Sequence, residues 1–220
     1  MSLISEKEST LQSVSANERK HYLLLKRLID IVASLVGLLL LSPVFLVVGI
    51  FIVVEDRNGP VLFKQIRVGK DGKTFFMYKF RSMVANAEEL KQTLLSKNEA
   101  EGPVFKIKDD PRVTRIGKFI RKTSIDELPQ LVNVLKGEMS LVGPRPPLVE
   151  EVEKYNNYEM QRLKVVPGLT CYWQISGRSN IGFSEWVELD LKYIQERNIL
   201  VDLKLIFKTI FVFFGSKNAY

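Results

Sequence analysis

The longest apolar stretch of the chain runs from Ile31 to Val54 and contains no charged residue. As a straight helix it would reach about 36 Å, which is enough to cross a bilayer. Ser42-Pro43 divides it, and proline kinks or breaks a helix because it removes a backbone donor and clashes with the preceding turn. Each half is too short to cross alone. The pattern therefore predicts either a kinked span or a re-entrant helix that enters and leaves by the same face.

Positive charge flanks this stretch on both sides: Arg19, Lys20, Lys26 and Arg27 precede it, and Arg57, Lys64, Arg67, Lys70 and Lys73 follow it. Because lysine and arginine mark the cytoplasmic side, this distribution favours re-entry with both ends in the cytoplasm. We expect Asp30, at the mouth of the stretch, to pair with a neighbouring arginine. The stretch has no polar face, which argues against a buried helix of a soluble protein.

The pattern changes after Gly59-Pro60. Residues 61–69 and 73–81 read as two strands around Asp71-Gly72, which is a hairpin signal. Further helices are predicted at 85–98, 124–135 (closed by Gly137), 149–163 and 184–197, whereas 112–121 fits a basic helix or an extended arm. The apolar tail at 203–214 suits an interfacial helix, and a docked core helix fits it nearly as well. The expected class is an α-rich α/β monotopic membrane protein: a polar arm (1–20), a re-entrant membrane helix (21–56) and a cytosolic catalytic domain (57–220).

The composition limits the kinds of catalytic and metal-binding site that the chain can form. The 220 residues suffice for one sizeable domain with an appendage, and the net charge of +7 suits an anionic partner. A single cysteine, Cys171, excludes an intramolecular disulfide, and a buried hydrophobic role fits it best. His21 is the sole histidine, so multi-histidine metal sites are excluded and a serine–histidine triad is disfavoured. Carboxylates, cations and a hard metal remain.

Asp126-Glu127 is the first candidate for that chemistry. Ser124 and Glu127 have the spacing of a capping box, so a purely structural role explains the pair on spacing alone. The functional interpretation uses the same physics, because a helix start and nearby arginines would hold Asp126 ionised. Such a carboxylate can attack an activated phosphorus and form an acyl phosphate. The pair could also hold Mg²⁺, which neutralises phosphate charge.

Cations elsewhere in the chain would complete a phosphate site. The candidates are Lys79, Arg81, Arg121 and Arg145. The planar fork of arginine suits bidentate contacts to diphosphate oxygens. Each of these side chains is, on its own, more often a solvated surface residue. Their clustering near proline and glycine, as in Gly143-Pro144-Arg145-Pro146, favours the functional interpretation.

Several segments together resemble one family. They are Lys26-Arg27-Leu28-Ile29-Asp30, Ser42-Pro43, Lys79-Phe80-Arg81-Ser82-Met83, Thr123-Ser124-Ile125-Asp126-Glu127-Leu128-Pro129-Gln130, the run from Asn133 to Pro146, and Pro167-Gly168-Leu169-Thr170. In order and spacing they resemble the monotopic bacterial phosphoglycosyl transferases, also called bacterial sugar transferases. The resemblance extends from about Lys26 to the C-terminus, and a single long apolar segment makes the chain similar to the short, catalytic-domain-only form.

The resemblance implies a function. Members transfer a sugar-1-phosphate from a UDP-sugar to undecaprenyl phosphate, releasing UMP and forming an undecaprenyl-diphospho-sugar. Asp126 matches the covalent nucleophile, Glu127 its partner, and Ser42-Pro43 the break of the re-entrant helix. Arg121 and Arg145 match phosphate-binding positions, whereas Arg178 and Asp190 match motif positions with less defined roles. The segment from Tyr172 to Arg178 is closer to members that use UDP-glucose or UDP-galactose.

The resemblance also implies a setting: Mg²⁺ as cofactor, the cytoplasmic face of the bacterial inner membrane, and the first membrane step of exopolysaccharide, capsule or O-antigen-type glycan assembly. A homodimer and downstream glycosyltransferases are further expected partners, and no nucleic-acid motif occurs. Two alternatives remain open. One is direct, Mg²⁺-dependent transfer without a covalent intermediate, and the other is a membrane-tethered module that binds anions without catalysis, which leaves Asp126-Glu127 unexplained.

Overall fold

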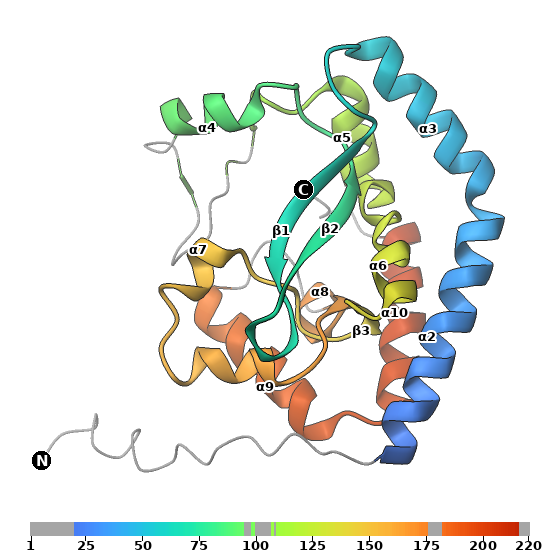
Figure 1. Ribbon diagram of the computed structural model, residues 1–220, viewed down its shortest axis with the longest axis vertical. Helices are drawn as coiled ribbons and strands as arrows, with labels where there is room; N and C mark the ends of the chain where they lie inside the picture. Colours follow the sequence, from blue (N-terminus) through green and yellow to red (C-terminus); the bar gives the residue numbers. More distant parts are fainter. Residues whose placement is uncertain (1–19, 95–97, 100–106, 108, 176–181, 216–220) are drawn as a thin grey trace, which may run out of the picture.

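The computed structural model describes residues 20–94, 98–99, 107, 109–175 and 182–215. Two long helices, α2 (Lys20–Leu40) and α3 (Ser42–Glu55), form one side of the molecule, and the other elements lie on their inner face (Figure 1). The predicted polar arm lies outside the described residues apart from Lys20, which begins α2. The elements that carry the catalytic and substrate-binding residues predicted from the sequence therefore lie on the inner face of α2 and α3. Arg178 is the exception, because it is outside the described residues.

The break between α2 and α3 falls where the sequence predicts it. The two helices are bent by 59° about the single residue Leu41. Ser42 donates its hydroxyl to the Leu39 carbonyl at 2.8 Å, and Pro43 occupies the first turn of α3, where its missing N–H leaves no intrahelical bond unmade. Among the described residues, neither helix alone has the length and apolar content to cross a membrane, whereas the bent pair together does.

Arg27 fastens α2 to the helix α6 (Gln130–Lys136). Its guanidinium donates to the carbonyls of Val134 at 2.6 Å and Leu135 at 2.7 Å. These carbonyls belong to the last turn of α6, where cations are stabilising because the helix dipole is negative there. The arginine therefore serves as a C-terminal cap supplied by another helix.

Asp30 and Lys26 continue this attachment. The Asp30 carboxylate accepts a hydrogen bond from the Leu141 amide at 2.9 Å, and Lys26 forms an ion pair of 2.8 Å with Asp202 of α10 (Ile199–Gly215). The expectation that Asp30 pairs with a neighbouring arginine is wrong. A nearby main-chain amide binds the carboxylate instead, because α2 packs directly against the segment that carries Leu141.

The predicted hairpin is confirmed. Strands β1 (Leu62–Val68) and β2 (Thr74–Phe80) pair antiparallel. Asp71 and Gly72 in the connection have φ values of 56° and 78°, the left-handed region that glycine and aspartate tolerate best. The hairpin lies across the inner side of the molecule, with β2 beside α6 (Figure 1).

A second, unpredicted sheet is short and parallel. Strand β3 (Ser140–Val142) pairs with β4 (Gly168–Thr170). Beyond them the Gly143 amide donates to the Thr170 carbonyl at 2.8 Å, and the Gly168 amide donates to the Pro144 carbonyl at 2.9 Å. A Cβ at Gly168 would overlap the Gly143 backbone. Only glycine permits so close an approach, and the contact fixes the start of the Pro-Arg-Pro turn.

The other helical elements are η1 (Lys70–Gly72), α4 (Ala87–Leu94), α5 (Arg115–Lys122), η3 (Ile125–Glu127), α7 (Val149–Val152), η4 (Glu159–Lys164), α8 (Tyr172–Ile175) and α9 (Phe183–Glu196). Two predicted boundaries are wrong. The helix expected from Ser124 begins only at Gln130. The helix expected over 149–163 is interrupted, because the Asn156 side chain accepts from the amides of Tyr158 and Glu159 and starts a new turn.

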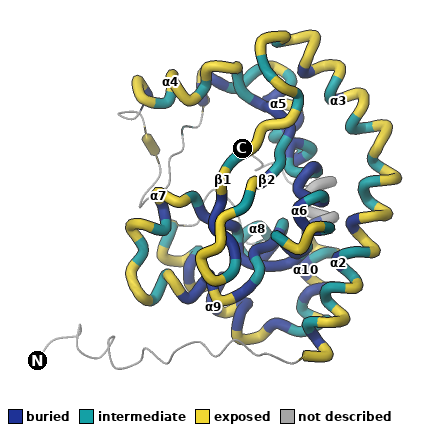
Figure 2. Tube along the Cα trace, in the orientation of Figure 1, coloured by how far each residue is buried: buried dark blue, intermediate teal, exposed yellow. Residues whose placement is uncertain are grey.

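The core is largest where α9 and α10 meet β3, and it includes Val142, Val187, Ile194 and Leu205. The tail helix α10 is docked there by Leu205, although Leu200 remains exposed. By contrast, the outer faces of α2 and α3 present apolar side chains that no described residue covers, as the exposed stretches in Figure 2 show. Such a surface is typical of contact with lipid or another apolar partner.

Candidate active site

The Asp126 turn joins α5 to α6. Ser124 has φ 53° and ψ 19°, a left-handed conformation that costs a residue other than glycine about 1 kcal/mol or more. The following residues form the single turn η3, which places the Asp126 side chain inward at 8% exposure. The Ser124 side chain makes no capping hydrogen bond. The capping-box interpretation is therefore wrong, and the strained turn orients Asp126 instead.

The electrostatics of Asp126 are set by burial and by neighbouring charges. Burial raises the pKa of its carboxyl from the ordinary 3.8 to about 6, and the charge of Glu127 acts in the same direction. Lys79 and Arg121 oppose that rise in pKa. No ion pair joins the Asp126 carboxylate to a described residue. The group is thus ionised at neutral pH and remains unneutralised by direct contact.

Lys79 approaches this turn from β2 and forms an ion pair of 2.6 Å with Glu127. The strand is held in place by Asn133 of α6, which is fully buried. The Asn133 amide donates to the Phe76 carbonyl at 2.7 Å and accepts from the Tyr78 amide at 3.0 Å. One buried asparagine therefore fixes the distance between the strand that carries Lys79 and the helix that follows Glu127.

Arg121, in the last turn of α5, donates from Nε to the Ser82 hydroxyl at 2.8 Å. Burial lowers the pKa of its guanidinium, while the charge of Asp126 raises it. Gly117 allows this contact, because a Cβ there would overlap the Ser82 carbonyl. The Lys-Phe-Arg-Ser segment and the basic helix thus pack closely enough to place Arg121 beside Asp126.

Arg67 is a member of the site that the sequence analysis missed. It is buried at the end of β1, and among the described residues its guanidinium donates to neutral oxygens only, those of Gln65 at 2.7 Å and Pro146 at 3.1 Å. Burial, and next the charge of Arg145, lower the pKa of Arg67 to about 9. The charge of Glu151 and, to a smaller extent, that of Glu127 oppose this lowering. No sequence signal indicates the burial, which arises because the Pro-Arg-Pro turn covers that face of the strand.

Arg145 lies on the same turn, with Cζ 5.9 Å from the Trp173 ring and 5.8 Å from the Trp186 ring. Such distances are typical of cation–π contacts, which hold a guanidinium without neutralising it. Neither Arg67 nor Arg145 forms an ion pair within the part of the chain that the structure describes. Two neighbouring, unneutralised guanidiniums form a site that favours a phosphate or diphosphate.

Arg81 and Asp190 do not join this cluster. The Arg81 guanidinium donates to the main-chain carbonyl of Asp56 and, at 3.0 Å, to the Asp56 carboxylate. It therefore attaches the end of α3 to the hairpin. Asp190 is 0% exposed and pairs with Arg162 at 2.7 Å. Both side chains are occupied by partners within the fold, so the structure gives neither a route to a substrate. Arg178 lies outside the described residues.

The donor set suits a shared rather than a closed magnesium site. Among the described residues, no group of three or more histidine, cysteine, aspartate or glutamate side chains is arranged to hold a metal. Asp126 and Glu127 supply two carboxylates on one turn. Magnesium commonly binds through one or two carboxylates together with substrate phosphates and water. The residues present fit that arrangement.

In the assembled site Lys79 and Arg121 act on the buried carboxylate of Asp126, and Arg67, beside Arg145, is within electrostatic reach of Glu127. A carboxylate is a competent nucleophile toward phosphorus when cations neutralise the phosphate that it approaches. The arrangement is accordingly suited to phosphoryl or phosphosugar transfer.

Comparison with known proteins agrees with this chemistry. Residues 21–216 match the bacterial sugar transferase family. Three similar proteins are galactosyl transferase CpsE of Streptococcus agalactiae serotype III (53% identical over 86% of this chain and 42% of the relative), the UDP-glucose:undecaprenyl-phosphate glucose-1-phosphate transferase of Escherichia coli K12 (42% identical over 90% and 42%), and exopolysaccharide production protein ExoY of Sinorhizobium fredii (40% identical over 89% and 88%).

The chain spans less than half the length of the first two relatives and most of the third. The family match, in contrast, runs from the start of α2 through α10 and contains every site residue described above. The chain therefore belongs to the bacterial sugar transferase family.

Proposed function

We propose that the chain transfers a hexose-1-phosphate from UDP-glucose or UDP-galactose to undecaprenyl phosphate. The observation that carries this proposal is the buried, unpaired carboxylate of Asp126 beside Lys79 and Arg121. The names of the relatives support the substrates, since they include a galactosyl transferase and a UDP-glucose:undecaprenyl-phosphate glucose-1-phosphate transferase. The ExoY relative supports a place in exopolysaccharide synthesis.

The proposed reaction has two steps. An Asp126 oxygen attacks the β-phosphorus of the UDP-sugar, and the bond from that phosphorus to the bridging oxygen breaks, so UMP leaves with the bridging oxygen. A phosphate oxygen of undecaprenyl phosphate then attacks the same phosphorus. The bond to Asp126 breaks, which restores the carboxylate and yields undecaprenyl-diphospho-sugar. No oxidant or further reactant is needed.

The residues divide the work by position. Lys79 and Arg121 are the cations that lower the pKa of Asp126, so they favour its ionised form. They would also neutralise the charge of the incoming phosphate. Arg67 and Arg145 form the neighbouring cationic pair, which suits the diphosphate and the departing UMP. Glu127 and Asp126 would hold Mg²⁺, which supplies further neutralisation of phosphate charge when bound.

Intact-mass measurement tests the proposal. Detergent-solubilised protein is mixed with UDP-glucose or UDP-galactose and Mg²⁺ without lipid acceptor, beside the Asp126→Asn variant. The expected result is an added hexose-phosphate on the wild type alone, with one equivalent of UMP released. If the acceptor receives sugar phosphate but the protein forms no adduct and releases no UMP in the absence of acceptor, direct transfer is favoured. Full activity in the presence of EDTA would contradict the Mg²⁺ requirement.

We also propose that α2 and α3 form a re-entrant helix in the bacterial inner membrane, with the site at the cytoplasmic face. The 59° bend, the exposed apolar faces and the positive flanks support this placement. A tag on residues 1–10 and a second tag after residue 215 should be accessible from the same side in oriented vesicles. In the Pro43→Ala variant the helix should be straighter, which should move the N-terminal tag to the opposite side of the membrane. Tags on opposite sides of the membrane in the wild-type protein would contradict re-entry.

A further inference from the structure

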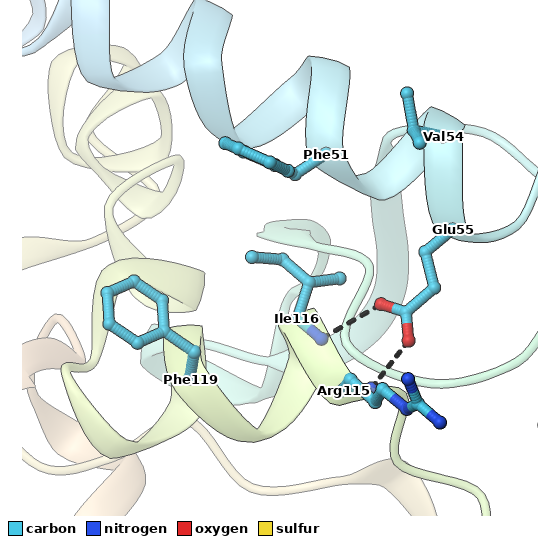
Figure 3. Close-up of a pocket in the computed structure, with 6 residues that line it drawn as sticks. All are labelled: Phe51, Val54, Glu55, Arg115, Ile116 and Phe119. Carbon is cyan, nitrogen blue, oxygen red and sulfur yellow. Dashed lines mark hydrogen bonds between the residues drawn. The ribbon is translucent and has the colours of Figure 1, made fainter.

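An apolar cleft of about 480 Å³ lies between the end of α3 and the start of α5. Its walls are Phe51, Val54, Glu55, Arg115, Ile116 and Phe119 (Figure 3). The cleft is open on its outer side rather than enclosed. The cleft lies apart from the Asp126 cluster, and none of its residues takes part in the chemistry described above.

Glu55 shapes the cleft, and the start of α5 binds its carboxylate. Its carboxylate accepts from the amides of Arg115 at 2.7 Å and Ile116 at 2.8 Å (Figure 3). These amides open the first turn of α5, where an anion is stabilised by the helix dipole. Among the described residues the Arg115 guanidinium forms no ion pair. The mouth of the cleft therefore has a cation available for an anionic ligand.

Most of the apolar residues that line the cleft are exposed, and a buried cluster supports them from below. Phe51 and Phe119 are each 55% exposed and Val54 is 67% exposed. Beneath them Ile52 and Ile120 belong to a buried cluster that joins α3 and α5. Aromatic side chains held open on a fixed base are a preformed surface for an apolar ligand, because leaving such area in water is unfavourable.

The course of α5 links this cleft to the catalytic turn. The helix has eight residues, so it spans about 12 Å from Arg115 to its end. Exposed Lys118 and Lys122 lie along it, and Arg121 in its last turn is beside Asp126. A ligand with an apolar chain in the cleft could therefore extend an anionic head along a cationic path to the nucleophile.

We propose that this cleft binds the first isoprene units of the lipid acceptor, with the acceptor phosphate directed along α5 toward Asp126. The assignment rests on the proposed function, which supplies a polyprenyl phosphate as acceptor. The acceptor is favoured over an ordinary phospholipid because one helix carries both the cleft wall and Arg121.

Photolabelling tests the assignment without requiring turnover. The protein is reconstituted in vesicles of phosphatidylcholine and phosphatidylglycerol, with a polyprenyl phosphate that carries a diazirine in its second isoprene unit. Labelling is expected to concentrate on the segments of Phe51 and Phe119. Val54→Trp should reduce it severalfold by filling the cleft, whereas Leu46→Trp, an equally exposed position on α3, should leave it unchanged. Equal labelling of these segments by a diazirine phospholipid would overturn the proposal.

Kinetics provide the second measurement. In Val54→Trp the KM for undecaprenyl phosphate should rise about tenfold, which corresponds to about 1.4 kcal/mol of lost binding. The KM for the UDP-sugar should match that of Leu46→Trp. An unchanged acceptor KM in Val54→Trp would overturn the assignment. Specific labelling of the cleft by a protein that transfers no sugar would retain the lipid site and contradict the proposed function.

Discussion

Two buried aspartates of this chain have opposite surroundings. Asp190 is fully enclosed, and Arg162 binds it at 2.7 Å. Asp126 is 8% exposed, and the cations near it act on its pKa without forming an ion pair. Burial raises the pKa of both carboxyl groups. Only Asp190 has a partner that satisfies its charge.

The difference separates structural from chemical carboxylates. A buried ion pair loses several kcal/mol when one member is removed, because the other is left buried and uncompensated. A carboxylate without such a partner already carries that cost in the native fold. Asp126 is therefore predicted to destabilise the protein while serving its reaction. The Asp190–Arg162 pair is predicted to lose stability when either partner alone is removed.

The largest expected effect is that of Asp126→Asn. Loss of the nucleophile should reduce transfer at least a thousandfold, while thermal stability rises. The rise in pKa from 3.8 to about 6 corresponds to up to roughly 3 kcal/mol near neutral pH that the folded state recovers when the charge is removed. UMP release and thermal unfolding followed by circular dichroism measure the two effects. A less stable variant would break the comparison, and ordinary turnover would remove Asp126 as nucleophile.

Arg162→Gln should show the opposite balance. Leaving Asp190 buried without its partner should cost about 3–5 kcal/mol of unfolding free energy. Denaturant unfolding measures this loss. Exchanging both members, as Arg162→Gln with Asp190→Asn, should recover part of the lost stability because the unpaired charge is gone. If the single variant kept its stability but lost donor binding, Asp190 would be part of the substrate site after all.

The pH dependence of the first step sharpens the comparison. Transfer requires ionised Asp126, so its rate should fall about tenfold per pH unit below pH 6. Stability should change in the opposite direction. Because the pKa of Asp126 is higher in the folded state, its contribution to stability is complete below about pH 4 and is lost as the pH rises through 6. Asp126→Asn should lack this part of the stability profile, and an identical profile in both proteins would contradict the raised pKa.

The smallest effect is expected from Lys79→Met. Lys79 lowers the pKa of Asp126, so its loss should move the acidic limb of the rate profile upward by about half a unit to one unit. The overall rate should fall as well, because a phosphate-neutralising cation is missing. Lys136→Met is the matched control, since Lys136 contacts Tyr78 on the same strand. A limb that stays in place would exclude Lys79 as a determinant of that pKa.

Local patterns predicted the elements that depend on local chemistry. The break at Ser42-Pro43 and the turn at Asp71-Gly72 follow from backbone restrictions that a few residues impose. The start of α6 did not follow, because Ser124 adopts a left-handed conformation that its sequence does not favour. Surrounding structure overrides local preference there.

The site was predictable in its residue types and only partly in its membership. The structure brings Lys79 and Arg121 to the acidic pair, whereas it places Arg145 beside Arg67. Arg81 could not be separated from Lys79 by sequence, since only the fold brings Asp56 to Arg81. Arg67 could not be found, because its burial depends on the distant Pro-Arg-Pro turn.

The attachment of α2 has one further consequence. Arg27 and Asp30 bind main-chain atoms of the catalytic part, namely the Val134 and Leu135 carbonyls and the Leu141 amide. Every amino acid other than proline offers those same atoms, so mutations at the receiving positions leave the joint intact. At these contacts anchor and catalyst can diverge independently in evolution, whereas the ion pair of Lys26 with Asp202 requires both side chains. Hybrids that combine the anchor of one relative with the catalytic part of another should assemble where the Lys-Arg-x-x-Asp pattern is present together with an acidic residue at the position of Asp202.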